Sequence, residues 1–227
     1  IIKRCVQMTF AEMDSRFYQI GSVLEYCHYR PQFGFRVKLG KRGDRKRSTV
    51  YYENDVYRNL VDNIERGAFS DIFWIDAASS GTRFSYRADD VQALLSFERD
   101  LRRDRVVRGI DVYLERDVDG RTIELHRASS GELSLMSSMI FLVANVIDDG
   151  VVIVDEPENS LHPNWQREYI DTVLTTLRYR DAAIVVATHA PLVVTGAIAQ
   201  NPGMISVFQV ENARPKLLKL DTAAAGG

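Results

Sequence analysis

Residues 151–163 read VVIVDEPENSLHP, and this stretch decides the fold that we expect for the whole chain. Its first four residues are apolar and β-branched, which is typical of a short parallel strand buried on both faces of an α/β sheet. Asp155 and Glu156 follow this strand directly. Ligands of such sheets bind beyond the carboxyl ends of the strands, so the two carboxylates are expected at a ligand site.

A Mg²⁺ ion is the expected partner of these two acids. Magnesium binds proteins through one or two carboxylates and completes its coordination with substrate phosphates. Two neighbouring charges at a buried strand end are unfavourable unless a partner compensates them. The alternative interpretation is an ordinary strand end with two solvated acids. Residues 151–156 by themselves do not distinguish a metal site from such a strand end. The motifs elsewhere in the chain favour the metal site.

The composition excludes several classes of protein. Lys and Arg number 29 and Asp and Glu 31, for a net charge of -2, so the chain as a whole carries no polyanion-binding signal. Cys5 and Cys27 lack the spacing of a zinc site or a disulfide framework, which favours a reducing cytoplasm. We expect no membrane span, because no run of about 18 apolar residues occurs. The chain starts without Met or a signal-peptide pattern, and we expect that it is entered midway.

The N-terminal part predicts an antiparallel β portion over residues 16–52. Residues 16–39 mix aromatic and β-branched residues with Gly and Pro, and residues 48–52 suggest a further strand. Between them, residues 40–47 read GKRGDRKR, which does not match the phosphate-loop pattern G-x-x-x-x-G-K-[ST]. We interpret this segment as a solvated hairpin tip, with contact to nucleic-acid phosphates as the alternative.

Residues 54–106 predict a helical lobe. Apolar residues follow helical spacing over residues 54–65, and Gly67 is placed to end that helix. A second amphipathic helix is expected over residues 88–105, with a charged, internally paired outer face. A short apolar run and a loop over residues 77–86 connect the two helices.

The core of the domain is predicted over residues 109–220, and it begins with a hairpin. Alternating residues flank Asp119-Gly120, a strong hairpin signal, and lead into Ser129, Ser130, Gly131 and Glu132 at the start of an apolar helix. Free N–H groups at a helix start bind anions. Ordinary capping is the alternative, since a Ser followed three residues later by Glu forms a capping box.

The C-terminal part predicts a second buried strand beside the first. A helix over residues 164–177 is followed by AAIVVA at residues 182–187, after which His189 stands at the carboxyl end of the strand. His189 is therefore expected next to Asp155 and Glu156. A third strand is expected over residues 204–210 and an edge strand over residues 216–220, before a featureless tail.

In this order the motifs resemble the ABC-type ATPase family over residues 109–210. That family has three motifs in a fixed order along the chain. They are Ser-Ser-Gly-Glu at a helix start, an apolar strand followed by DEPE, and a strand followed by His. The chain resembles the soluble, AAA-type branch of the family that includes RecF, SMC-like and OLD proteins. DEPENSLHP and ATHAP look especially like the OLD-like ATPases of bacterial phage defence, including the Septu and retron-associated ones. The resemblance implies an α/β fold with a mostly parallel sheet flanked by helices, an antiparallel β portion and a helical lobe.

The resemblance also implies a role for each matching residue. Asp155 matches the aspartate that holds Mg²⁺ through water, Glu156 the acid that polarises the attacking water, and His189 the histidine that senses the γ-phosphate. The signature motif, which in the family contacts ATP held by the opposite subunit, corresponds to Ser129, Ser130, Gly131 and Glu132. The D-loop at the dimer interface corresponds to Glu158, Asn159, Ser160, Leu161 and His162.

Two departures from the family pattern affect these expectations. Ser130 stands where transporters usually have Gly, which argues for the soluble branch. No phosphate loop occurs in these residues, although ATP binding in the family depends on its amides and lysine. We expect that an upstream segment or another chain supplies this loop.

The leading hypothesis is the ATPase engine of a cytoplasmic anti-phage complex. ATP and Mg²⁺ would be sandwiched in a head-to-tail homodimer or higher oligomer that controls a nuclease partner. One alternative is a DNA repair or segregation ATPase of the RecF or SMC type, with Lys38 to Arg47 facing nucleic acid. Another is a scaffold lobe that does not hydrolyse ATP, which the missing phosphate loop favours and the intact Glu156 and His189 oppose.

Overall fold

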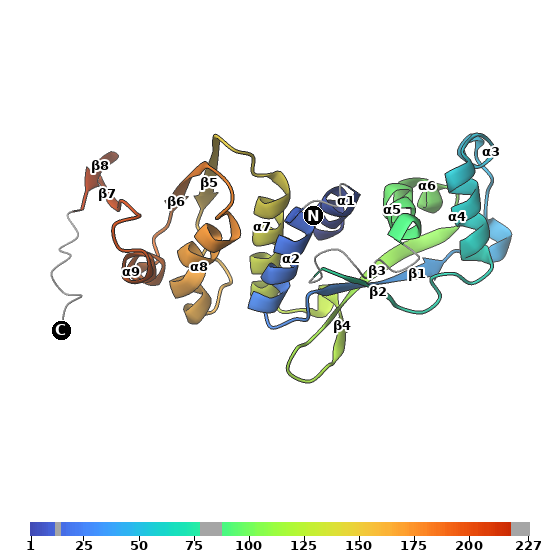
Figure 1. Cartoon of the computed structure of the whole chain (residues 1–227), viewed down its shortest axis with the longest axis horizontal. Coiled ribbons are helices and arrows are strands. Elements are labelled where there is room, and N and C mark those ends of the chain that lie inside the picture. Colours follow the sequence, from blue (N-terminus) through green and yellow to red (C-terminus); the bar gives the residue numbers. More distant parts are fainter. Residues whose placement is uncertain (12–14, 78–87, 219–227) are drawn as a thin grey trace. The chain divides into compact units, whose positions relative to one another are not determined.

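The computed structural model describes residues 1–11, 15–77 and 88–218 of the chain (Figure 1). The loop expected over residues 77–86 lies outside this part except for its first residue, and the expected tail lies outside it entirely. The fold is mixed α/β, as predicted, with a four-stranded antiparallel sheet, a parallel strand pair and a C-terminal hairpin. The chain divides into two compact units, Ile1–Asn145 and Val146–Gly227.

The first unit is built on the antiparallel sheet, whose strands lie in the order β2-β1-β3-β4. Phe33 and Phe35 of β1 and Leu114 of β3 are fully buried, and buried apolar side chains of the helices complete the core of this unit. The helices of the unit are α1 (Ile2–Ala11), α2 (Ser15–Tyr26), α3 (Thr49–Glu53), α4 (Asp55–Glu65), α5 (Ala88–Ser96), α6 (Glu98–Arg103) and α7 (Ser130–Asn145). Its strands are β1 (Gln32–Leu39), β2 (Phe73–Asp76), β3 (Val107–Glu115) and β4 (Thr122–Glu124), and its 3-10 turns are η1 (Arg42–Asp44) and η2 (Leu125–Arg127).

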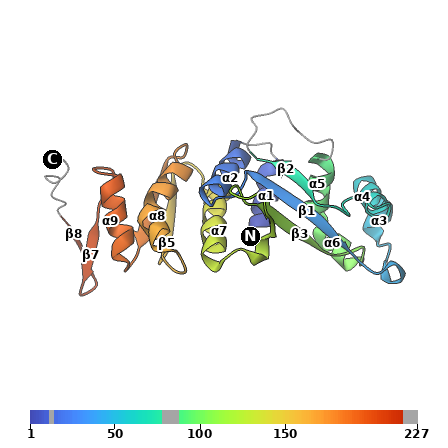
Figure 2. The same cartoon turned by 90° about the horizontal axis from the view of Figure 1, so that it is seen from below.

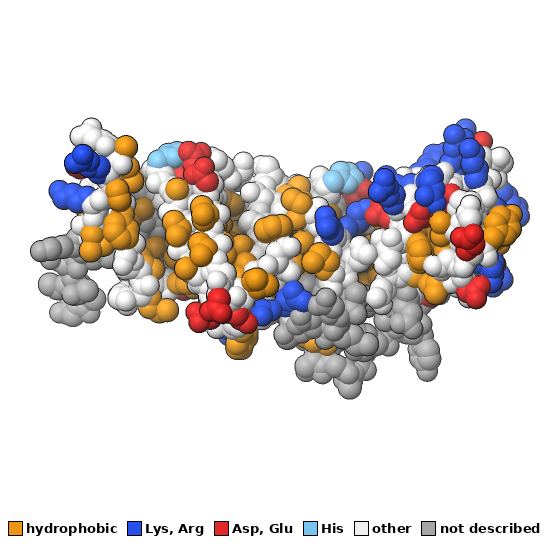
Figure 3. All heavy atoms as spheres, turned by 90° about the horizontal axis from the view of Figure 1, so that it is seen from above, with side chains coloured by type: hydrophobic (Ala, Val, Ile, Leu, Met, Phe, Trp, Pro, Cys, Tyr) orange, Lys and Arg blue, Asp and Glu red, His pale blue; other side chains and the backbone are white. Residues whose placement is uncertain are grey.

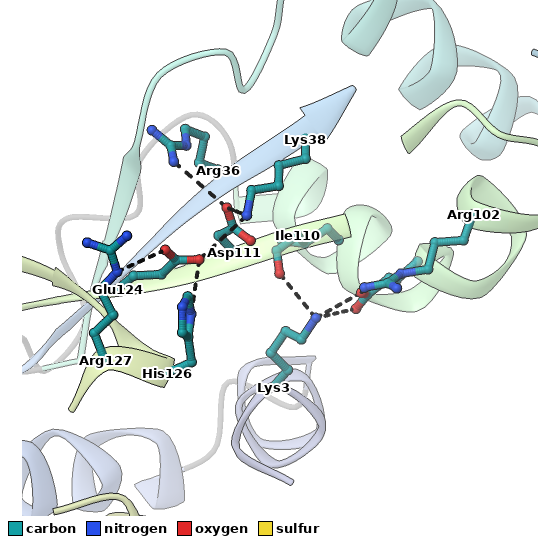
Figure 4. A network of polar contacts seen from close by, with 10 residues as sticks. Lys3, Arg36, Lys38, Arg102, Ile110, Asp111, Glu124, His126 and Arg127 are labelled. Atoms are coloured by element: carbon teal, nitrogen blue, oxygen red, sulfur yellow. Dashed lines mark hydrogen bonds and ion pairs between the residues drawn. The ribbon is translucent and has the colours of Figure 1, made fainter. Parts of the chain in front are cut away.

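Polar contacts fasten the N-terminal helix to the sheet (Figure 4). Lys3 of α1 donates to Glu98 at the start of α6 at 2.8 Å and to the carbonyl of Ile110 in β3 at 3.2 Å. Helices α1 and α2 both pack against α7 (Figures 1 and 2). Helix α7, which begins at the expected signature motif, therefore packs against the two helices at the N-terminal end of the chain.

The strand prediction for residues 16–39 is wrong in its first part and confirmed in its second. Residues 15–26 form α2, whereas residues 32–39 form β1. Phe17, Ile20 and Leu24 recur at helical spacing and are buried, and this spacing prevails over the β propensity of the aromatic and branched residues.

The strand expected over residues 48–52 is also wrong, since these residues enter α3. The Tyr51 hydroxyl donates to Asp62 of α4 at 3.1 Å, and Arg47 stacks on the Tyr51 ring. These tertiary contacts stabilise the helix against the local β propensity. The β portion expected over residues 16–52 is thus half helical, and β2 adds a strand inside the lobe expected to be helical.

The helices of that lobe are largely as predicted. Helix α4 ends at Glu65 with Arg66 as its C-cap, and Gly67 follows with a φ of 98° that favours glycine. The expected second helix is divided at Phe97 into α5 and α6, where the Phe97 ring packs edge-on against Tyr57 at 5.2 Å. The hairpin around Asp119-Gly120 is confirmed by the antiparallel pairing of β3 with β4.

The second unit consists of the parallel pair β5 (Gly150–Asp155) and β6 (Ala182–Ala187), the helices α8 (Pro163–Thr176) and α9 (Pro191–Gln200), and the hairpin β7 (Phe208–Glu211) with β8 (Arg214–Leu217). Helix α9 crosses α8 closely at Gly196, where an added Cβ would lie 2.0 Å from the Arg167 carbonyl oxygen. The two helices of the unit therefore pack directly against each other.

Two predictions for this unit need correction. The strands at residues 151–154 and 182–187 are not buried on both faces, since Val151 is 67%, Ile153 76% and Val185 55% exposed. The third strand starts only at Phe208 and pairs with β8 instead of extending the parallel sheet. Asn212 and Ala213 both adopt positive φ, the conformation of a tight two-residue hairpin turn, and this turn directs β7 onto β8.

Neither Cys5 nor Cys27 forms a disulfide in the described chain, and both are buried. Among the described residues no helix is long and apolar enough to cross a membrane.

Candidate functional site

The parallel pairing of β5 and β6 brings the two expected strand ends together. Asp155 lies opposite Ala187 in the register, and the Glu156 amide donates to the Ala187 carbonyl at 2.8 Å. The chain therefore leaves both strands at the same edge, as the sequence predicts. Glu156 adopts a φ of 46°, in the left-handed region that is uncommon for a non-glycine residue.

His189 and Glu156 form the exposed part of a cluster at this edge. His189 Nδ1 lies 3.3 Å from Glu156 Oε1, and Asn159 Nδ2 donates to Glu156 Oε2 at 3.2 Å. The His189 side chain is 73% exposed and that of Glu156 is 48% exposed. Figure 3 shows a histidine beside acidic side chains on the surface of this unit. A ligand can therefore reach both groups from solvent.

Glu158 forms the buried part of the same cluster. Its side chain is only 7% exposed, and it accepts hydrogen bonds from the Thr188 hydroxyl at 2.7 Å and from the His189 amide at 3.2 Å. Burial raises the pKa of this carboxyl, but the hydrogen bonds from Thr188, from its own amide and from His189 outweigh burial and leave the pKa below its ordinary value. Glu158 is therefore an ionised group inside the site.

The other residues expected in the D-loop divide by exposure. Leu161 is buried, whereas Asn159, Ser160 and His162 are exposed. His162 also caps α8, because its Nδ1 accepts from the Asn164 amide at 3.3 Å. Only the exposed members of the segment are available to a second subunit.

The donor set at the strand end fits a magnesium ion. Asp155 and Glu156 both expose carboxylate oxygens, the hard ligands that Mg²⁺ prefers. No group of three or more His, Cys, Asp or Glu side chains among the described residues could hold a metal. Protein ligands alone would therefore leave the coordination incomplete, as is usual where Mg²⁺ is shared between a carboxylate, water and phosphate.

The expected signature residues form a capping box at the start of α7. The Ser129 amide donates to Glu132 Oε2 at 2.8 Å, and the Glu132 amide donates to Ser129 Oγ at 3.2 Å. Ser130 is exposed and Gly131 is buried. Burial raises the pKa of Glu132, but the Ser129 hydrogen bonds and Arg116 outweigh burial and leave the pKa below its ordinary value. This motif belongs to the first unit, and the DEPE segment and His189 belong to the second.

Sequence reasoning missed Thr188 and assigned Glu158 only to the D-loop. The signal for Thr188 was its place directly before His189, where a hydroxyl can bond to a neighbouring acid. No periodicity distinguishes Glu158 from Glu156, since only the folded loop buries one carboxylate and exposes the other.

A parallel strand pair with an acidic pair at the end of one strand and a histidine at the end of its neighbour is the arrangement of an α/β domain of the ATPase class. The chain belongs to the family described as "AAA domain, putative AbiEii toxin, Type IV TA system", whose model matches residues 31–195.

Two individual proteins are also similar to this chain. Protein ea59 of Escherichia phage lambda is 30% identical over 125 residues, which cover 53% of this chain and 23% of that protein. The chain thus spans about a quarter of the length of this relative. A solved structure described as "Structural biochemistry of ATP-driven dimerization and DNA stimulated activation of SMC ATPases" aligns with 51% of this chain and 67% of its own, at a TM-score of 0.36 and 12% identity. A TM-score this low does not establish a shared fold.

Proposed function

We propose that this chain is the part of an ATP-hydrolysing engine that carries the catalytic acid, the magnesium-binding aspartate and the phosphate-sensing histidine. The observation that carries the proposal is the contact of His189 with Glu156 at the edge where β5 and β6 end, in a chain of the AAA-domain family. Asp155 would hold Mg²⁺, which neutralises phosphate charge when bound.

Each residue of the cluster has a defined part in this proposal. Glu156 orients and polarises the attacking water, and Asn159 fixes its second carboxylate oxygen. His189 uses its exposed ring to contact the γ-phosphate. Phosphoryl transfer depends mainly on positioning and on charge stabilisation, and these three side chains supply both at one strand edge.

We further propose that the engine works as a head-to-tail dimer in a defence complex. Ser129, Ser130, Gly131 and Glu132 would contact ATP held by the opposite subunit, and Asn159, Ser160 and His162 would lie at the interface. The family description names a toxin of a toxin–antitoxin system, which supports a defensive setting. A nuclease partner under the control of the ATP state completes this proposal.

The test is the Glu156→Gln variant of the full-length protein. We expect ATP hydrolysis to fall by about a hundredfold or more, because the amide cannot accept a proton from the attacking water. ATP binding and ATP-dependent dimerisation should remain, since the amide keeps the size and the hydrogen-bonding shape of the side chain. Phosphate release and sedimentation velocity with Mg-ATP measure the two effects. Retained turnover would exclude the catalytic role of Glu156.

A second candidate function, nucleic-acid binding, is favoured by a local excess of positive charge in the first unit. Residues 40–47 and 98–108 contain 10 Lys and Arg against 4 Asp and Glu, whereas the whole chain has a net charge of -2. The two segments are in contact, because the Gly40 amide donates to the Val106 carbonyl and the Lys46 amide to the Asp104 carbonyl, both at 2.8 Å. Lys and Arg side chains gather over this end of the unit, near α3 and α4 (Figure 3).

The cations of this surface divide into two groups. Arg45 and Arg47 form ion pairs with Glu65 at 3.3 and 2.8 Å, and Lys38 pairs with Asp111 at 2.8 Å. The side chains of Lys41, Arg42 and Lys46 are exposed and form no hydrogen bond or ion pair with any described residue. Only part of the segment from Lys38 to Arg47 is therefore available to phosphates.

A further inference from the structure

The loop after β5 and the loop after β6 are joined by one buried carboxylate. Glu158 Oε2 accepts from the Thr188 hydroxyl at 2.7 Å, and Glu158 Oε1 accepts from the His189 amide at 3.2 Å. Both oxygens of this carboxylate are thus occupied by donors from the chain segment that carries His189. A carboxylate that is buried and satisfied in this way is not available to a second subunit.

The same carboxylate reaches the imidazole ring. His189 Nδ1 lies 3.5 Å from Glu158 Oε1 and 3.3 Å from Glu156 Oε1, so two acidic oxygens face one ring nitrogen. An ionised carboxylate only accepts hydrogen bonds, so the tautomer with its proton on Nδ1 suits this arrangement. In this tautomer Nε2 is the unprotonated ring nitrogen.

Thr188 extends the contact to the next helix. Its hydroxyl donates to Glu158 and accepts from the Ala190 amide at 3.0 Å, directly before α9 begins at Pro191. The hydroxyl thus has one donor and one acceptor role, and both are used. Glu158, Thr188 and the start of α9 form a single hydrogen-bonded chain that brackets His189.

From these contacts we propose that Glu158 is a positioning residue that holds the His189 ring, with Nδ1 protonated, against the Glu156 carboxylate. This inference rests on the proposed function and refines it, because Glu158 acts through His189 within its own subunit instead of at a dimer interface. Supporting residues that orient a group in direct contact with substrate commonly change activity by about 10- to 100-fold when they are mutated.

The activity test compares three variants of the full-length protein with Mg-ATP. Glu158→Gln places an amide N–H2 among donors, and Thr188→Val removes the hydroxyl without changing the side-chain shape. Both should lower kcat by about 10- to 100-fold with KM for ATP changed less than about threefold. Thr188→Ser restores the hydroxyl and should recover most of the loss. Thr195→Val makes the same replacement where the hydroxyl bonds only within α9, and its kcat should equal that of the wild type.

A spectroscopic test does not depend on activity. The ¹⁵N chemical shifts of the His189 ring should show a protonated Nδ1 in the wild type and in Thr195→Val. In Glu158→Gln the proton should redistribute toward Nε2, because one of the two facing carboxylates has become an amide. The shift measurement therefore examines the position of the ring even in a protein without turnover.

The outcomes separate this inference from the proposed function. The wild type could show no ATP hydrolysis, while its Nδ1 is protonated and this protonation is lost in Glu158→Gln. That result would contradict the ATPase role and support the positioning role. The positioning role would be overturned if the wild type hydrolyses ATP and both Glu158→Gln and Thr188→Val keep its kcat and its His189 ring ¹⁵N shifts. If Glu158→Gln does not fold, the Thr188→Val and Thr188→Ser pair decides the question.

Discussion

At the residue scale, Glu156 is the position where backbone geometry and chemistry meet. Its φ of 46° places an L side chain in a region that costs about 1–2 kcal/mol per residue relative to the right-handed one. Such strain persists only where the surrounding structure imposes it, and it is concentrated at functional sites. Here the amide of Glu156 is bound to the Ala187 carbonyl, and its carboxylate lies 3.3 Å from His189 Nδ1.

Because of this backbone geometry, we expect a glycine at position 156 to give a more stable protein than an alanine, the reverse of the usual order in a helix. Both Glu156→Ala and Glu156→Gly remove the contacts with Asn159 and His189, but only glycine removes the strain. We expect the free energy of unfolding of Glu156→Gly to exceed that of Glu156→Ala by about 1 kcal/mol. Urea denaturation followed by circular dichroism measures the difference.

The matched control for the glycine effect is Arg167, an exposed residue in the interior of α8. There Arg167→Gly should be less stable than Arg167→Ala by about 1 kcal/mol, because glycine loses more backbone entropy in a helix. If the alanine variant is more stable than the glycine variant at both positions, the backbone of Glu156 is not strained.

At the element scale, the start of α7 shows how one motif serves both a helix and a site. The reciprocal hydrogen bonds between Ser129 and Glu132 satisfy two amides that the helix leaves without intrahelical partners. The alternative of ordinary capping is thus confirmed. Capping does not oppose the proposed signature role, because Ser130 stays exposed next to the capped turn.

The capping box predicts a pH-dependent contribution to stability. The folded-state pKa of Glu132 is lowered from 4.5, so its ionised form stabilises the fold above the unfolded-state pKa. This contribution is lost as the pH falls through the lower, folded-state value. At neutral pH the wild type should exceed Glu132→Gln by about 0.5 kcal/mol, since a negative charge near a helix N-terminus is favourable.

Urea denaturation of the two proteins as a function of pH checks this prediction. The difference should stay constant above the ordinary pKa and decrease on acidification below it. A difference that grows on acidification would mean that Glu132 is destabilised by its charge, which contradicts the capping geometry.

At the scale of the whole molecule, charge is distributed unevenly over a chain whose total is nearly balanced. The positive charge belongs to two contacting segments of the first unit, and the acidic cluster with His189 belongs to the second. Total charge therefore gives no information about whether one surface binds polyanions, although local charge does.

The nucleic-acid candidate predicts a specific loss on charge reversal. Replacing Lys41, Arg42 and Lys46 together by Glu should weaken binding to a DNA duplex by about tenfold or more. It should also reduce the slope of log affinity against log salt by about 3, because about one counterion is released for each phosphate contact. Fluorescence anisotropy of a labelled duplex over a range of salt concentrations gives both quantities.

The control changes net charge equally at exposed arginines outside the two segments. Arg121, Arg178 and Arg214 replaced together by Glu should leave the salt slope nearly unchanged. An equal loss in both triple variants would mean that net charge alone causes binding. No measurable binding by the wild type would exclude this candidate function.

The sequence by itself determined the class of the fold and the meeting of the site residues at the edge where β5 and β6 end. Apolar runs with β-branched residues predicted β5 and β6, and the known geometry of parallel strands predicted that Glu156 and His189 would meet. Asp119-Gly120 and Gly67 located a hairpin and a helix end, because few residues adopt the backbone conformations that these turns require. These predictions succeed because they depend on short-range pattern and on strand direction.

Only the tertiary structure decided which residues are buried or paired. Residues 16–26 have the composition of a strand, yet they form α2 because their apolar face packs against α7. Arg45 and Lys46 are neighbours of the same charge, but only Arg45 reaches Glu65. Glu156 and Glu158 are chemically identical, and the fold exposes the first and surrounds the second with donors from Thr188 and His189. Contacts between residues far apart in the chain set these differences, and such contacts leave no local pattern in the sequence.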